Sequence, residues 1–280
     1  ARHRCQQGGY TFQLVRVLRG LWAVYTMRAE YQTARELAEQ QLSLAQQLND
    51  PTFLLAAHEA LGFLLPWPAE WILAREHSAR AVSFYEPQKH RIYVSLFEAN
   101  LGLWALCNLT LPLWYLGYPD QALKKIDEVL PLAQGLGHPY SLGWTCCCAT
   151  LLHQYRHEPQ EARGPVETLL TLSHEYGFLF LIAWGNVLRG WAVAMRGDEE
   201  EGISQIRNGL SIYHAMGTEM GRTYFLALLA EGHKKAGQPQ EGLAVLAEAL
   251  AQVDKTDERF YEAEPYRIKG ELTLQREARG

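Results

Sequence analysis

The sequence predicts an all-α chain folded as a right-handed α-solenoid of two-helix repeats with a period of about 40 residues. Three observations predict this fold. Small residues recur at a fixed spacing, apolar residues follow helical periods, and no segment shows the period-two alternation of a half-buried strand. A solenoid also accommodates 280 residues without the size limit of a single core.

Two sets of positions define the repeat. The first set closes the polar turn between the helices of each unit, with steps of 40 residues and one step of 48: Ala34, Ala74, Ala122, Ala162, Gly202 and Gly242. The second set lies 12 residues upstream and continues for one more step: Trp22, Gly62, Thr110, Thr150, Gly190, Ala230 and Gly270. The long step predicts an eight-residue insertion around residues 85–91.

Each unit is predicted to hold two helices of different character. First helices such as residues 101–116 and 178–195 are almost continuously apolar, which is typical of a helix packed on two sides. The second helices are more amphipathic, and the apolar residues of 122–132 follow the 3.6-residue period. Small residues at the closing positions would let the two helices of a unit approach each other closely.

The turns between helices carry the expected breakers. Asp50-Pro51 and His138-Pro139 are predicted to end second helices, because the residue before proline is pushed out of the α region. Three glycines are predicted to end first helices in the left-handed conformation: Gly117, Gly197 and Gly237.

The domain organisation follows from the repeat. We expect residues 1–9 to be a lead-in from a preceding region, and residues 10–280 to form one repeat domain of six full repeats and a truncated seventh. The sequence does not begin with Met, so we expect it to be a fragment of a longer protein.

Composition narrows the functional classes. Lys and Arg number 26 against 31 Asp and Glu, and 48% of residues are hydrophobic, so a disordered chain is excluded and a general nucleic-acid binder is disfavoured. No apolar run reaches the about 18 residues of a membrane span. An odd number of cysteines, three of them consecutive, indicates a reducing, cytoplasmic compartment: Cys5, Cys107, Cys146, Cys147 and Cys148.

Several segments resemble a known family in their order and spacing: residues 113–122, 189–192, 226–231, 259–264 and 269–272. The pattern resembles tetratricopeptide repeats of the longer, MalT-like class. It is most similar to the C-terminal helical region of large bacterial predicted ATPases, many fused to class III adenylate or guanylate cyclases and others LuxR-like regulators. The resemblance covers most of residues 10–275 and is weakest over 97–108.

The resemblance implies a regulatory binding scaffold without catalytic residues or cofactor. No G-x-x-x-x-G-K-[ST] phosphate loop occurs in the sequence, so any ATPase or cyclase chemistry of a parent protein would lie outside this chain. The expected partner is a protein, a peptide or another domain of the parent chain, with no membrane and no direct nucleic-acid contact. The alternative is a sensor of a small, oligosaccharide-like ligand, and an enzyme is a distant third.

Large aromatic residues occupy one equivalent position in four consecutive units: Trp104, Trp144, Trp184 and Tyr224. In tetratricopeptide folds this position faces the concave groove, so the resemblance implies an aromatic ladder there, with rings partly exposed for a ligand. Six further residues complete the candidate groove: Trp114, Trp191, Asn108, Gln154, Glu231 and Arg267. The alternative is that these aromatic rings pack between repeats as core.

Metal binding is not expected. Cys146, Cys147 and Cys148 would point about 100° apart on a helix, so they are predicted to fill apolar space rather than to bind one ion together. His153 and His157 have the i,i+4 spacing of a helical chelate, but no third ligand is evident in the sequence.

Overall fold

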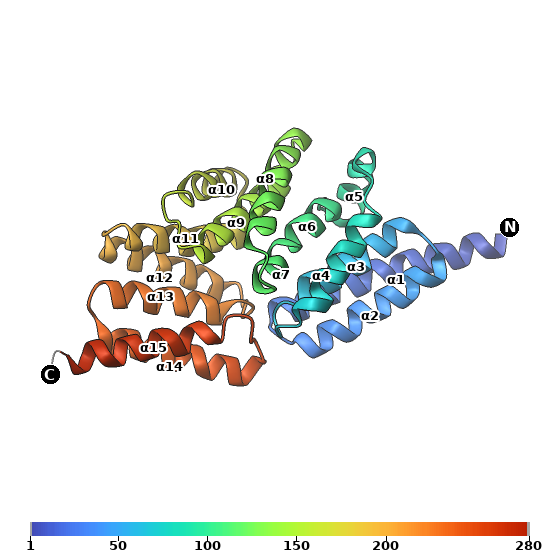
Figure 1. Ribbon diagram of the computed structural model, residues 1–280. Coiled ribbons are helices and arrows are strands. Elements are labelled where there is room, and N and C mark those ends of the chain that lie inside the picture. The colour runs from blue at the N-terminus through green and yellow to red at the C-terminus, as the bar shows by residue number, and fades with distance from the viewer. Residues whose placement is uncertain (1, 279–280) are drawn as a thin grey trace. The chain divides into compact units, whose positions relative to one another are not determined.

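The computed structural model describes residues 2–278, shown as a ribbon in Figure 1. Within these residues the regular structure is helical, with one short 3₁₀ helix and no strand, which confirms the predicted all-α class. The elements are α1 (Arg2–Met27), α2 (Tyr31–Leu48), α3 (Pro51–Leu64), α4 (Trp71–Ser83), η1 (Pro87–Lys89), α5 (His90–Phe97), α6 (Leu101–Asn108), α7 (Thr110–Tyr115), α8 (Pro119–Leu136), α9 (Pro139–Tyr155), α10 (Arg163–Tyr176), α11 (Leu179–Met195), α12 (Glu199–Ala215), α13 (Arg222–Lys235), α14 (Pro239–Thr256) and α15 (Ala263–Glu277).

The chain divides into two compact units. The first comprises the chain up to Pro66 together with Glu70–Leu132, and the second comprises Trp67–Ala69 and the chain from Ala133 onward. Helix α1 begins at Arg2, so the predicted lead-in is helical from that residue and continuous with the first helix of the first repeat.

Helices pair as the repeat predicts. In the second unit α9 packs on α10, α11 on α12 and α13 on α14, and each first helix also packs on the first helix of the next pair. Each second helix contacts the following first helix as well, since α10 meets α11, α12 meets α13 and α14 meets α15. In the first unit α1 pairs with α2 and α3 with α4.

The insertion lies where the 48-residue step places it. Helices η1 and α5 follow α4 and occupy the extra length. The first helix of the next unit is divided at Leu109 into α6 and α7. Pro112 lacks the N–H that would bond to the Asn108 carbonyl, and the Thr110 hydroxyl donates to the Cys107 carbonyl at 2.7 Å, which together explain the break.

The turns after the first helices share one backbone conformation. The three glycines predicted to end first helices have the left-handed backbone conformation. The equivalent residues of the other units are not glycines but have the same conformation. The six positive φ angles are 58° at Ala29, 65° at Ala69, 85° at Gly117, 54° at His157, 103° at Gly197 and 69° at Gly237. The turn geometry therefore repeats with the period even where the residue type does not.

Small residues bring the two helices of a unit into backbone contact. A Cβ atom added to Gly190 would lie 2.6 Å from the Gly202 carbonyl oxygen, and one added to Gly202 would lie 2.5 Å from the Gly190 oxygen. The alanines at the closing positions of the other units are fully buried: Ala34, Ala74, Ala122 and Ala162. The predicted close approach is therefore present.

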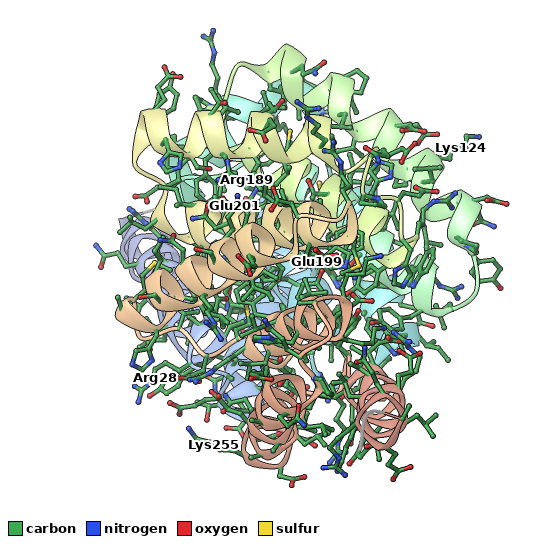
Figure 2. All side chains as sticks on the ribbon, turned by 90° about the vertical axis from the view of Figure 1, so that its left-hand side faces the viewer. Arg28, Lys124, Arg189, Glu199, Glu201 and Lys255 are labelled. Carbon is green, nitrogen blue, oxygen red and sulfur yellow. The ribbon has the colours of Figure 1, made fainter. Side chains whose placement is uncertain are left out.

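The second helices carry the charged surface. Lys124 on α8 and Lys255 on α14 project away from their helices into solvent (Figure 2). The apolar first helices are short: in the described part of the chain no single helix is long and apolar enough to cross a membrane. One pair, 91–97 and 101–115, reaches that length and hydropathy only jointly, across a bend of 89°.

Gly190→Ala should destabilise the second unit by about 1–3 kcal/mol, because the new methyl group overlaps the Gly202 backbone. Urea unfolding followed by circular dichroism measures the change. Gly135→Ala is the matched control, since Gly135 is exposed on α8 with no atom within 4 Å of an added Cβ. The free energy of unfolding of this control variant should rise by up to about 1 kcal/mol, because alanine has a higher helix propensity than glycine. Equal effects of the two substitutions would contradict the close approach.

Candidate partner-binding surface

The predicted aromatic ladder is buried in the second unit. Trp144 is 9% exposed, Trp184 4% and Tyr224 0%. Their rings form a continuous series with Phe180 between the first two: Trp144 to Phe180 is 6.4 Å between centroids, Phe180 to Trp184 is 6.2 Å and Trp184 to Tyr224 is 6.0 Å. Such spacings are those of packed aromatic pairs.

The expectation that these rings are partly exposed is therefore wrong. The physical reason is that first helices of neighbouring units pack directly on each other, so a side chain at this position is enclosed by the next helix. Phe225 of α13, for example, meets the Trp184 ring edge-on at 4.7 Å. The alternative interpretation, packing between repeats, agrees with the burial.

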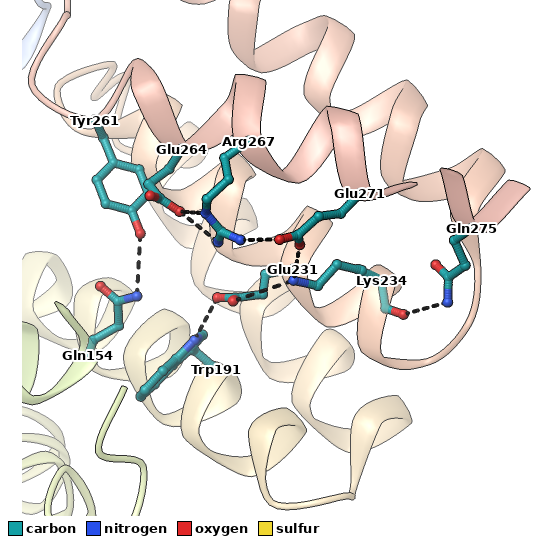
Figure 3. Close-up of polar contacts among 9 residues, drawn as sticks. All are labelled: Gln154, Trp191, Glu231, Lys234, Tyr261, Glu264, Arg267, Glu271 and Gln275. Atoms are coloured by element: carbon teal, nitrogen blue, oxygen red, sulfur yellow. Dashed lines mark hydrogen bonds and ion pairs between the residues drawn. The ribbon is translucent and has the colours of Figure 1, made fainter. Parts of the chain in front are cut away.

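Gln154 and Tyr224 form a polar contact inside this core. The Tyr224 hydroxyl donates to Gln154 Oε1 at 2.9 Å. Gln154 Nε2 donates to the Tyr261 hydroxyl at 3.4 Å, as Figure 3 shows. Gln154 is fully buried, so these bonds compensate its desolvation and link α9, α13 and the segment before α15. Gln154 is a structural link here.

Three candidate residues belong to the first unit. Trp104 is half-buried against the apolar cluster around Leu55 and Tyr93, and Trp114 is half-buried on α7. Asn108 Nδ2 donates to Glu59 Oε1 at 3.2 Å. The same Glu59 carboxylate pairs with Arg19 at 2.6 Å, so these polar groups satisfy one another.

Trp191 and Glu231 start a polar series that leads from the core to the surface. The Trp191 indole N–H donates to Glu231 Oε2 at 2.9 Å, and both residues are buried. Lys234 Nζ lies 4.0 Å from the other Glu231 oxygen. Because Glu231 is held on both sides, its buried charge is compensated.

The series continues onto α15. Lys234 Nζ pairs with Glu271 at 2.7 Å, and Glu271 also accepts from Arg267 Nη1 at 2.6 Å. Arg267 pairs in addition with Glu264 at 2.7 Å. Figure 3 shows Glu264, Arg267 and Glu271 in one row and Glu231 with Lys234 in a second row, joined by the contact between Lys234 and Glu271. We call the set the polar ladder: Glu231, Lys234, Glu264, Arg267 and Glu271.

Hydrogen bonding favours the charged forms of Arg267 and Glu271. The bond to Glu264 raises the pKa of Arg267 above its usual value, and the carboxylate of Glu271 has its pKa lowered, chiefly by the hydrogen bond from Lys234. By residue type the ladder has three carboxylates and two cations.

The outer members are accessible to a partner. The side chains of Arg267 and Glu271 are 41% and 43% exposed, whereas that of Glu231 is 6% exposed. Exposed ion pairs contribute only about 0–1 kcal/mol each, so a partner's charged groups can replace them at low cost. The hydrogen bond from Trp191 thus fixes the inner end of the polar ladder, whereas a partner can replace the ion pairs at its outer end on α15.

The residues weighed for metal binding have other contacts. His153 Nδ1 lies 2.9 Å from Glu158 Oε2, and the His157 ring lies 6.2 Å from the Trp191 ring. All three consecutive cysteines are buried: Cys146, Cys147 and Cys148. No three His, Cys, Asp or Glu side chains in the described part of the chain are grouped to hold an ion.

Of the ladder residues, the sequence singled out Glu231 and Arg267 but not Lys234, Glu264 or Glu271. A signal was present, since Trp191, Glu231 and Glu271 are successive members of one 40-residue register. That register places Trp191, Glu231 and Glu271 on the successive first helices α11, α13 and α15.

No protein-family model matches the chain. A curated relative, an uncharacterized protein of Rhizobium meliloti, is 18% identical over 257 residues, which cover 90% of this chain and 24% of the relative. The chain thus spans about a quarter of the length of the curated relative it matches.

Solved tetratricopeptide-repeat structures share the fold. A Rap protein complexed with Competence and Sporulation Factor has a TM-score of 0.57 at 12% identity, covering 92% of this chain and 75% of that one. RapI without ligand has a TM-score of 0.56 at 10% identity, covering 94% and 99%. A STAND signal-transduction ATPase from Pyrococcus horikoshii, with a tetratricopeptide repeat sensor, has 0.50 at 12% identity, covering 86% and 37%. The chain therefore has a tetratricopeptide-like α-solenoid fold.

Trp184→Ala should cost about 3–5 kcal/mol of unfolding free energy, because it leaves a large cavity in the aromatic core. Urea unfolding of the purified chain, followed by far-UV circular dichroism, gives the shift. Tyr266→Ala is the control, since Tyr266 on α15 is 56% exposed, and it should change stability by less than about 0.5 kcal/mol. A Trp184 variant as stable as this control would restore the exposed-ladder interpretation.

Proposed function

We propose that the chain is a non-enzymatic protein-interaction scaffold that binds a peptide or protein through the polar ladder of its second unit. The observation that carries the proposal is a row of exposed, mutually paired charges on α15, anchored to the core through the Trp191–Glu231 hydrogen bond. The solved neighbours add support for this use of the fold, because one of them is complexed with the Competence and Sporulation Factor.

The ladder favours a basic partner. Of its three carboxylates, Glu231 is 6% exposed, whereas Glu264 and Glu271 are partly exposed on α15 and are the ones that a partner meets. A lysine or arginine of the partner can take over part of the bonding that Arg267 and Lys234 now provide. Complementary charge of this kind contributes more to specificity and association rate than to affinity.

We further propose that the scaffold is one part of a larger bacterial signalling protein in the cytoplasm, an ATPase or a nucleotide cyclase. The STAND ATPase, of which this chain matches 37%, supports that setting, as does the low coverage of the Rhizobium meliloti relative. In this arrangement, partner capture at the ladder would alter contacts with the catalytic part of the parent protein.

A phage-displayed library of random peptides, panned on the purified chain, tests the function. Selected peptides should be basic, and fluorescence anisotropy should show that Glu271→Lys weakens their binding about tenfold. The reason is that the new lysine lies beside Lys234 and Arg267 and repels a cationic partner.

Glu277→Lys supplies the matched control. It makes the same charge change on the same helix, at an exposed residue outside the ladder, and should alter the dissociation constant by less than twofold. Equal losses from the two variants would show that only net charge matters. Failure to select any peptide would argue against a peptide-binding role.

A further inference from the structure

A second, separate feature of the second unit is a cavity of about 190 Å³ between α12, α13 and α14. Its apolar wall includes Tyr213, Leu226 and Leu229, all buried, and Thr218 lines it from the turn before α13. Arg222 and Glu248 lie at its polar side. None of these residues belongs to the polar ladder, so the cavity is independent of the proposed function.

The cavity lies beside a late helix start. Helix α11 begins at Leu179, and one repeat later α13 would begin at residue 219, but it begins at Arg222. Hydrogen bonds hold the segment that precedes it. The Tyr213 hydroxyl donates to the Met220 carbonyl at 2.6 Å, and the Gly221 N–H donates to the buried Glu258 carboxylate at 2.7 Å. Because both bonds are buried, the wall at Thr218 is fixed in place.

Three of the side chains that line the cavity are basic or acidic: His214, Arg222 and Glu248. Glu219, outside the lining, makes the cluster around Arg222 acidic. Arg222 pairs with Glu219 at 3.2 Å and with Glu248 at 2.5 Å, so two carboxylates face one guanidinium. Glu219 also accepts from Gln252 Nε2 at 3.0 Å. The Glu248 side chain is 52% exposed against 24% for Glu219, which makes Glu248 the carboxylate that an entering cation meets.

Size and charge together define a ligand class. A cavity of about 150 Å³ lined by apolar side chains binds benzene, so this one accommodates a single aromatic ring with a short substituent. An anionic substituent would meet the excess carboxylate, whereas an ammonium would pair with it. We propose that the cavity binds a small aromatic amine, with the ring against Leu226 and Leu229 and the ammonium on Glu248.

Calorimetric titration of the full chain with phenethylamine and with phenylacetate tests the proposal. Phenethylamine should bind two- to fivefold more tightly, which is the contribution of an exposed ion pair. Glu248→Gln should remove most of that preference, and Glu241→Gln, an exposed acid on the same helix outside the cavity, should leave it unchanged. Equal or tighter binding of phenylacetate would overturn the proposal.

Substitutions by larger side chains that fill the cavity provide a second test of the proposal. Thr218→Phe should weaken phenethylamine binding at least tenfold, and Leu210→Trp, at a half-buried lining residue, should do the same if the first variant fails to fold. Unchanged binding in a folded variant would place the amine elsewhere. The tripeptide Phe-Gly-Gly carries the same ring and ammonium, and tighter binding of it than of phenethylamine would assign the cavity to a peptide terminus instead of a small molecule.

Discussion

The close approach of two helices at small residues is the constraint on which the rest of the structure depends. At Gly190 and Gly202 the backbones of α11 and α12 are so near that neither position has room for a Cβ atom. The positions equivalent to Gly202 in the other units hold alanine or glycine and are buried, whereas those equivalent to Gly190 also include Trp22, Thr110 and Thr150. Because the helices of a unit are this close, the first helix is enclosed by its partner and by its neighbours in sequence.

That enclosure decides which residues reach a partner. Trp144, Trp184 and Tyr224, on the first helices α9, α11 and α13, are nearly inaccessible. On α15, Arg267 and Glu271 reach solvent and are the outer members of the polar ladder. The buried Trp191–Glu231 bond connects this surface to the core, so the ladder has a fixed anchor and an exchangeable end.

The fold was predictable because the repeat is visible in single residues. The small positions, the left-handed turns at Gly117 and Gly197, and the insertion at 85–91 all lie where spacing places them. The break at Leu109 was not predicted, although Pro112 was available as its signal. The sequence alone could not show that helices such as α11 and α13 lie too close for a ring to remain exposed between them.

The site was predictable only in part, for a related reason. The sequence singled out Glu231 and Arg267, but their connection through Lys234 and Glu271 depends on side chains 37 and 40 residues apart meeting across two helices. The cavity beside Thr218 lies next to a helix start displaced by three residues, and sequence does not determine helix ends to that accuracy. The repeat register predicts which residues face a neighbouring helix. The interactions that they form there depend on distances that the sequence does not give.

Native-state hydrogen exchange of the amides of α11 tests the central claim most directly. If close helix approach encloses α11, its central amides should exchange only when the second unit unfolds, with an opening free energy equal to that from urea unfolding. The last turn of α15, which is exposed, should exchange much faster. Exchange of the α11 amides through local openings, at rates similar to that last turn, would contradict the account.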